Sequence, residues 1–169
     1  MGLAVSRTLC VLSALSLLFV GCMSDGGDPP PPTQMELRSF QTREYDTTDT
    51  KLVMKAMLNV LQDMGFIVND ADAELGLLTA SKWTGIEHSK KEVKRARKDE
   101  VSLSKSLVLE CTANISLFDK QSRVRVNFQK RILDTQGATM EASPVEDAAF
   151  YQTFFSKVDK GIFLQQEGV

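Results

Sequence analysis

The hydrophobic positions of this chain follow two spacings, one typical of helices and one typical of strands. Between residues 49 and 65, apolar side chains recur every three or four positions, which predicts an amphipathic helix. Asp49 can accept hydrogen bonds from its first amides, and Gly65 follows its last turn. A second helix is expected near the end of the chain, and its predicted buried stripe consists of Tyr151, Phe154, Phe155, Val158 and Ile162.

The start of this second helix is predicted from a capping pattern. Ser143 is the expected cap, Pro144 occupies the first helical position, and Glu146 completes a capping box three residues after the cap. Acidic residues come before basic ones along the segment, which complements the dipole of a helix. The sequence therefore predicts a helix that begins at Ser143.

Strict alternation of apolar and polar residues predicts the strands. It is nearly unbroken over residues 107–117 and 123–132, which a short polar turn can join as a hairpin. Shorter strands are expected at 37–45, 66–68 and 75–83. In the first long strand, the expected apolar face consists of Leu107, Leu109, Cys111, Ala113, Ile115 and Leu117. One apolar face and one polar face indicate an antiparallel sheet that is covered on one side.

Together these elements predict an α+β fold in the order β-α-β-β-β-β-α. We expect an antiparallel sheet of four to five strands with two helices packed on one face. Residues 36–165 are enough for one hydrophobic core, so they are expected to form a single domain. A basic insertion is expected within this domain at about residues 86–100.

The first part of the chain has the pattern of an export signal. Residues 1–21 contain one charged residue, Arg7, followed by an apolar run from Leu9 to Val20. This run is shorter than the ~20 apolar residues that a membrane-spanning helix needs. Residues 22–35 are rich in glycine and contain four consecutive prolines, which predicts an extended tether.

The segment Leu18-Phe19-Val20-Gly21-Cys22 resembles the lipobox of bacterial lipoproteins, in which the cysteine is lipid-modified and becomes the first mature residue. This resemblance implies a lipid anchor on Cys22 in the bacterial cell envelope. Met23 stands where an aspartate would resemble an inner-membrane retention signal, so we expect the outer membrane, with the domain facing the periplasm. A plain secretory signal and N-myristoylation at Gly2 are the alternatives.

The order of elements, in a chain with such a signal, also resembles that of small helix-grip domains. These domains occur in outer-membrane assembly lipoproteins and in uncharacterised bacterial lipoproteins. The resemblance covers most of residues 36–165, but it concerns architecture alone. It therefore implies no catalytic residue.

Few residues of the expected domain could support catalysis. Its one cysteine, Cys111, lies on the apolar face of a predicted strand, so a role in the core is expected. His88 is the chain's single histidine and has no second histidine or spaced cysteine with which to bind a metal. A dyad of Cys111 and His88 is the alternative, although nothing in the sequence positions the pair. We predict a non-enzymatic protein that has no cofactor and no metal site.

Positive charge is concentrated in one segment, although the chain as a whole has a net charge of -2. Residues 90–98 include one acidic residue, Glu92, and six basic ones, Lys90, Lys91, Lys94, Arg95, Arg97 and Lys98. Such a segment can bind an anionic envelope component such as phospholipid, lipopolysaccharide or a cell-wall polymer. A solvated charged helix is the alternative. Because export is expected, nucleic acid is not an expected partner.

Three arginines on the polar side of the second long strand are the expected docking residues for a protein partner. They are Arg123, Arg125 and Arg131. We predict a membrane-anchored lipoprotein that acts through protein-protein contacts in an envelope assembly, whose partner the sequence does not name. Binding of an anionic component through residues 90–98 is the alternative function.

The anchor prediction can be tested by replacing the proposed lipidation site. Cys22→Ser removes the thiol that would carry the lipid, so this variant should leave the membrane fraction. Fractionation of cells expressing the native and substituted chains measures this. If the variant still sediments with membranes after a high-salt wash, the lipoprotein interpretation fails.

Overall fold

The structure is a computed structural model that describes residues 32–168. The predicted signal, Cys22 and nearly all of the predicted tether lie outside this range. The elements in chain order are α1 (Gln34–Gln41), β1 (Thr42–Tyr45), α2 (Thr50–Asp63), β2 (Ile67–Asp72), β3 (Leu77–Gly85), α3 (Lys90–Asp99), β4 (Ser104–Phe118), β5 (Gln121–Asp134), β6 (Thr139–Pro144) and α4 (Ala148–Gln166).

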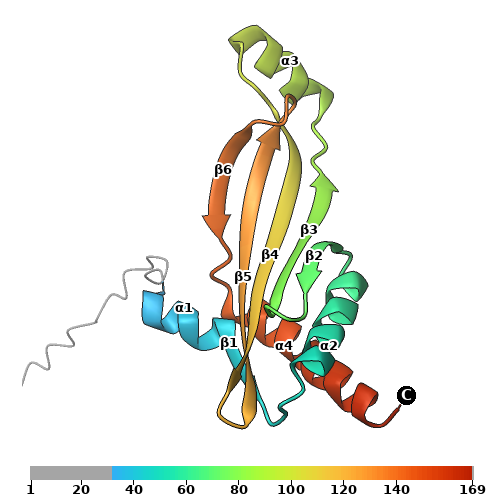
Figure 1. The fold of residues 1–169 in the computed structure, drawn as a ribbon. Coiled ribbons are helices and arrows are strands. Elements are labelled where there is room, and N and C mark those ends of the chain that lie inside the picture. Colours follow the sequence, from blue (N-terminus) through green and yellow to red (C-terminus); the bar gives the residue numbers. More distant parts are fainter. Residues whose placement is uncertain (1–31, 169) are drawn as a thin grey trace, which may run out of the picture. The chain divides into compact units, whose positions relative to one another are not determined.

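Six strands form one antiparallel sheet (Figure 1). Its order is β1-β5-β4-β3-β2, and β6 also pairs with β5. Strand β1 pairs with residues 122–125 of β5, whereas β6 pairs with residues 129–133. The two short strands therefore share the edge of β5 that faces away from β4.

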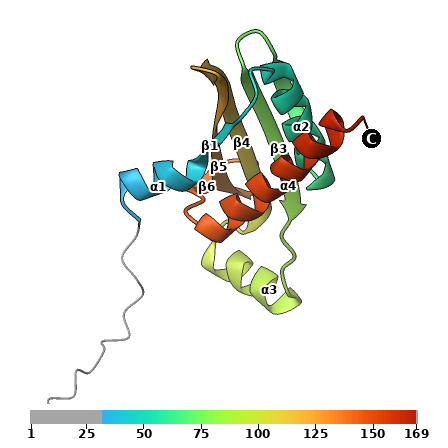
Figure 2. The same ribbon diagram turned by 90° about the horizontal axis from the view of Figure 1, so that it is seen from below.

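Helices α2 and α4 pack side by side on one face of the sheet (Figure 2). The alternation of β4 and β5 directs one set of apolar side chains toward these helices. The largest fully buried side chains of the core include Tyr151, Phe128, Phe154, Met57, Leu61 and Leu78. The β4–β5 hairpin extends past the helices at one end, where α3 connects β3 to β4 (Figure 1).

The hydroxyl group of Tyr151 completes the sheet at the point where β5 changes partner. Phe128 lies between the residues that pair with β1 and those that pair with β6, so neither strand offers an acceptor to its amide. The Phe128 amide instead donates to the Tyr151 hydroxyl oxygen over 3.0 Å, and the Phe128 carbonyl accepts from the Val145 amide over 2.9 Å. Gln41 also donates to the Tyr151 hydroxyl, over 3.3 Å. One buried tyrosine therefore joins α4 to both α1 and β5.

The predicted α+β class with an antiparallel sheet is confirmed, but the predicted number of elements is wrong. The sheet has six strands where four to five were predicted, and residues 32–168 contain four helices where two were predicted. The predicted order omitted α1, α3 and β6. The predicted helices with strong apolar stripes are present as α2 and α4.

The strand predicted at 37–45 is mostly helix α1. Thr33 and Glu36 form a capping box that begins this helix, and only the last four residues of the predicted strand pair with β5. Leu37 and Gln41 are one helical turn apart and are both buried. The residues with high strand propensity in this segment favour a strand, whereas the capping pattern correctly indicates a helix.

The predicted start of the last helix is also wrong. Residues 139–144, including Ser143 and Pro144, form β6 on β5, and Asp147 is the cap of α4. A proline is compatible with the last position of an edge strand because no amide is required there. The predicted stripe of α4 is nevertheless correct, since all five of its residues are buried.

Most of the buried side chains of the long strands face the helix layer. Cys111, Ala113 and Ile115 face the helices and are buried, as predicted. Leu117 has the same orientation but is 57% exposed, because it lies next to the turn that joins β4 to β5. The prediction that it belongs to the buried face is therefore wrong.

Removal of the Tyr151 hydroxyl should destabilise the fold. Tyr151→Phe keeps the ring but leaves the buried Phe128 amide without an acceptor, which costs about 1–3 kcal/mol in the free energy of unfolding. Urea denaturation measures this change. Tyr45→Phe is the matched control, because the buried Tyr45 hydroxyl lies near Arg43 and Asp159 but makes no hydrogen bond of standard geometry within residues 32–168. Equal losses in the two variants would contradict the role assigned to Tyr151.

Gly76 provides a second stability test, at the turn between β2 and β3. Its φ angle is +68°, and an added Cβ atom would lie 1.9 Å from the Ile115 carbonyl oxygen. Gly76→Ala should therefore lower the thermal midpoint far more than Gly137→Ala. At Gly137 the φ angle is +87°, but no atom lies within 4 Å of an added Cβ, so only the left-handed backbone cost of about 1–2 kcal/mol remains. Similar midpoints for both variants would contradict the close approach at Gly76.

Candidate interaction surface

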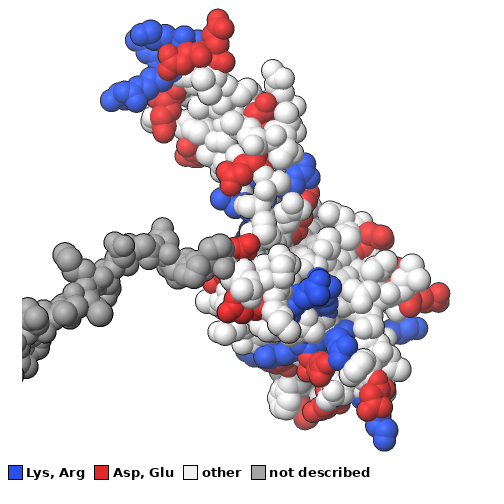
Figure 3. Space-filling view, turned by 90° about the vertical axis from the view of Figure 1, so that its left-hand side faces the viewer, with Lys and Arg blue, Asp and Glu red and all other residues white. Residues whose placement is uncertain are grey.

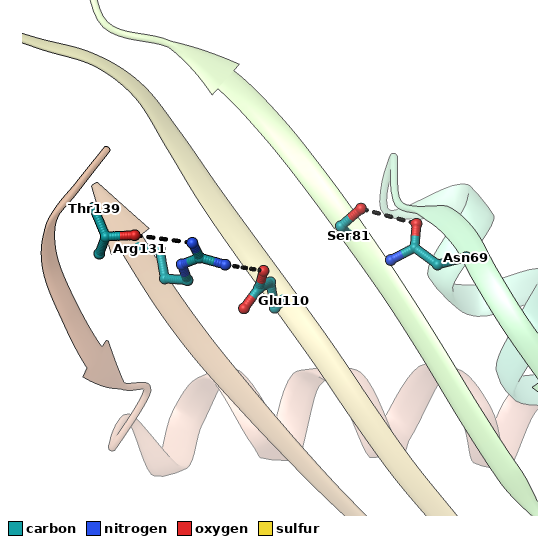
Figure 4. Close-up of polar contacts among 5 residues, drawn as sticks. All are labelled: Asn69, Ser81, Glu110, Arg131 and Thr139. Atoms are coloured by element: carbon teal, nitrogen blue, oxygen red, sulfur yellow. Dashed lines mark hydrogen bonds and ion pairs between the residues drawn. The ribbon is translucent and has the colours of Figure 1, made fainter. Parts of the chain in front are cut away.

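The sheet face that points away from α2 and α4 is called the open face. Its side chains come from alternate positions of the strands, because successive strand residues point to opposite faces. In Figure 4, α4 lies behind the sheet and the labelled polar side chains lie in front of it. The strand register places on this face, among others, Ile67, Leu77, Thr79, Ser81, Trp83, Val108, Glu110, Thr112, Asn114, Arg123, Arg125, Asn127, Gln129 and Arg131.

Arg131 connects three strands across the open face (Figure 4). Its Nη1 atom is 2.8 Å from Oε1 of Glu110 on β4, and its Nη2 atom donates to Oγ1 of Thr139 on β6 over 2.9 Å. On the other side of the face, the Ser81 hydroxyl donates to Oδ1 of Asn69 over 3.1 Å. These contacts hold polar side chains in fixed positions on both sides of an apolar centre.

This apolar centre, called the Trp83 patch, consists of Ile67, Trp83 and Val108. Trp83 is 60% exposed and Ile67 is 68% exposed. Ile67 pairs with Ser81, two residues before Trp83, so both apolar side chains lie on neighbouring positions of the same face. Val108 pairs with Trp83 on one side and with Arg131 on the other, and it is only 2% exposed. The patch therefore has a buried floor and two exposed apolar side chains.

The three predicted docking arginines lie on the open face, but their surroundings differ. Arg123 is ion-paired with Glu44 of β1 at 2.8 Å, and its guanidinium carbon lies 3.4 Å from the centre of the Phe118 ring. Arg131 is ion-paired as described above. Arg125 is exposed and takes part in none of the ion pairs found among residues 32–168. Arg125 is therefore the member of the predicted set with the freest guanidinium.

The six predicted anion-binding residues all lie on α3. Ser89 and Glu92 form a capping box at its start, and Glu100 ends it in the left-handed conformation with φ of 54°. Every one of the six basic side chains is exposed. Figure 3 shows them as a blue cluster, with acidic side chains beside it, at the end of the molecule where α3 lies. The structure thus brings this set together and separates it from the three arginines of β5.

The two residues considered for catalysis lie far apart. Cys111 is 1% exposed, and burial raises the pKa of its thiol to about 12, so the reactive thiolate is strongly disfavoured. His88 precedes α3, and its Nε2 atom donates to the carbonyl oxygen of Ser104. Ser104 is seven residues from Cys111 along β4, which corresponds to ~23 Å at ~3.3 Å per residue. The alternative Cys111–His88 dyad is therefore wrong.

The predicted lipidation site, Cys22, lies outside the residues that the structure describes. Within residues 32–168, no helix is both long enough and apolar enough to cross a membrane. The anchor at Cys22 therefore remains a prediction.

Sequence reasoning did not identify Trp83 or Ile67 as surface residues. The sequence predicts a strand at 75–83, but this prediction does not assign the residues of the strand to its two faces. Its alternation contains the missing signal, because Leu78 and Ala80 are buried and Trp83 has the opposite parity. A tryptophan at the exposed parity of a half-buried strand indicates an interaction surface.

Comparisons with known proteins do not assign this chain to a family. No protein-family model matches it, and no curated protein matches it. Among solved structures, a TBP-like protein from Parabacteroides distasonis has 10% sequence identity and a TM-score of 0.36, over 72% of this chain and 90% of that chain. A DUF4468 family protein from Bacteroides ovatus has 11% identity and a TM-score of 0.36, over 72% of this chain and 84% of that chain. These similarities are too low to carry an argument about function.

Proposed function

We propose that this chain is a non-enzymatic lipoprotein of the bacterial cell envelope that binds a protein partner through the Trp83 patch. In this proposal, the lipid on Cys22 anchors the chain, and residues 22–32, which precede the cap of α1 at Thr33, hold the domain away from the membrane. The open face then contacts another component of an envelope assembly. The observation that carries the proposal is the exposure of Trp83 beside Ile67 on a sheet face opposite the helices.

The composition of the patch supports a protein partner. Tryptophan and arginine are enriched at the centres of protein interfaces, where an aromatic side chain provides most of the buried area. Trp83 provides this aromatic group, and Arg131 lies in register with it across Val108. The sheet provides a rigid base, so little backbone ordering would be required on binding.

The contacts of the arginines refine the docking surface predicted from the sequence. An arginine that already bonds a carboxylate offers fewer free donors, although exposed ion pairs of this kind contribute only about 0–1 kcal/mol. Arg131 lies beside Val108 of the Trp83 patch and Arg123 lies farther along β5, and both are best assigned to keeping the neighbouring strands aligned. Arg125 keeps a free guanidinium for contacts with a partner.

The surroundings of Cys111 support a role without covalent catalysis by this residue. A catalytic thiol needs a lowered pKa and access to solvent, whereas burial raises the pKa of Cys111 to about 12. The same burial fits a small apolar residue of the core, next to Ala80 on one strand and Phe128 on the other.

A tryptophan substitution tests the proposed surface. Trp83→Ala should abolish the specific crosslinks that the native chain forms in intact envelopes, because it removes the main apolar contact of the patch. The thermal midpoint should change little, since the side chain is 60% exposed. Crosslinking in the native envelope, followed by identification of the captured protein, measures the first effect.

Phe163→Ala is the matched control for this experiment. Phe163 is also a large aromatic residue, is 59% exposed, and lies on α4 outside the Trp83 patch. The proposal predicts that this variant keeps the crosslinks that Trp83→Ala loses. If both variants keep them, or if both lose them, the Trp83 patch is not the partner site.

A further inference from the structure

Helix α3 is a charged element that the rest of the fold does not require. It has no buried residue, and it lies at the end of the β4–β5 hairpin that is farthest from α2 and α4 (Figure 1). Its capping box satisfies amides at its start, and its left-handed end satisfies the Ala96 carbonyl, so both ends are capped locally. A ten-residue helix is marginal without tertiary packing, so the core gains little from its presence.

The basic residues of α3 are concentrated on one face. At 3.6 residues per turn, five of them fall within an arc of about 140°. These five, called the cationic face, are Lys90, Lys91, Lys94, Arg95 and Lys98. Glu92 and Asp99 lie outside this arc, and the half-buried Val93 and Ala96 lie on the opposite side of the helix. The helix therefore presents cations outward and its small apolar residues inward.

None of the basic side chains of the cationic face is ion-paired within residues 32–168. All three ion pairs among residues 32–168 lie on other elements. Lys90, Lys94 and Lys98 follow one another at intervals of four residues, as do Lys91 and Arg95, and like charges at this spacing destabilise a helix. An anionic partner would remove this repulsion. The full chain has a net charge of -2, so any attraction of an anionic partner must come from the cationic face itself.

Apolar side chains beside the cationic face favour a membrane surface over a soluble polyanion. Val101 is 61% exposed directly after α3. A shallow hollow of about 280 Å³ at the edge of the cationic face is lined by Lys90 and Lys94 together with His88, Val93 and Arg97. Basic residues around exposed apolar groups are typical of segments that bind the interface of an anionic bilayer.

We infer that the cationic face of α3 docks on the surface of an anionic phospholipid bilayer. Lipid phosphates would contact the lysines and Arg95 of this face. The choice of a bilayer as the anionic surface depends on the envelope location proposed above. The binding itself does not depend on the Trp83 patch, because the two surfaces use different residues and different elements.

Vesicle binding by the full chain tests this inference. All variants carry Cys22→Ser, so that no lipid is attached and any contribution of the N-terminal segment is the same in each. Co-sedimentation is measured with vesicles of phosphatidylglycerol and phosphatidylcholine, and with vesicles of phosphatidylcholine alone. We expect binding to the anionic vesicles to be at least about tenfold tighter, and to weaken as salt is raised.

A matched pair of charge-reversal variants separates the cationic face from overall charge. Lys94→Glu, Arg95→Glu and Lys98→Glu together should remove the preference for anionic vesicles. Lys51→Glu, Lys55→Glu and Lys157→Glu change the net charge by the same amount at exposed positions of α2 and α4 and should keep it. Lys94→Gln, Arg95→Gln and Lys98→Gln together provide a neutral variant, which should also lose most of the preference, and circular dichroism checks that each protein is folded.

Each of the following outcomes would overturn the inference. The first is equal binding of the native chain to both kinds of vesicle, and the second is an equal loss in the two charge-reversal variants. The third is release from anionic vesicles by millimolar inorganic phosphate, or tighter binding to soluble heparin than to the vesicles, which would indicate a site for a soluble anion. If the native chain does not bind anionic vesicles but still forms its Trp83-dependent crosslinks, the bilayer inference fails and the proposed function stands.

Discussion

The long β4–β5 hairpin is the constraint on which the rest of the structure depends. Strands β1, β6 and β3 all pair with it, and α2 and α4 cover only part of one of its faces. Where the helices cover it, alternation produces a one-sided core that includes Cys111, Val124 and Phe128. Past the helices, the same two strands continue with less cover and end near α3 (Figure 1). The Trp83 patch and the cationic face of α3 both lie outside the helix-covered core. The residues that stabilise the fold and the residues proposed to bind partners are therefore separate.

The outer edge of β5 shows how this long strand accommodates two short partners. An edge shared by β1 and β6 leaves a gap at Phe128, and a buried amide at such a gap needs another acceptor. Tyr151 provides it from α4, and Gln41 reaches the same hydroxyl from α1. The aromatic rings of Phe40, Phe128 and Phe150 surround Tyr151 at centroid distances of 4.8–6.0 Å from one another or from its ring. One polar contact within an aromatic cluster thus couples the edge of the sheet to the helix layer.

The sequence predicted elements with strong periodicity well and elements without it poorly. The apolar stripes of α2 and α4 and the alternation of β4 and β5 correctly predict most of the buried residues of these elements. Each pattern extends over many positions, so one exception does not change the prediction. Helix α1 was missed because its β-forming residues outweighed the Thr33–Glu36 capping box, and β6 was missed because Ser143 and Pro144 also fit a helix start. The basic set of α3 was found from composition alone. The Trp83 patch was not, because parity indicates only that Trp83 lies on the face opposite Leu78 and Ala80, and a sequence pattern does not specify that this face is left uncovered.

The division of the sheet into a stabilising part and a less covered part can be measured directly by hydrogen exchange of backbone amides in the folded chain. We expect amides of β4 near Cys111, Ala113 and Ile115 to exchange only through global unfolding, because they lie under the helices. Amides near Ser106 should exchange through smaller local openings, and amides within α3 should have the least protection. Equal protection along β4 and α3 would contradict this division. It would show that the part of β4 under the helices and the part near α3 unfold as one cooperative unit.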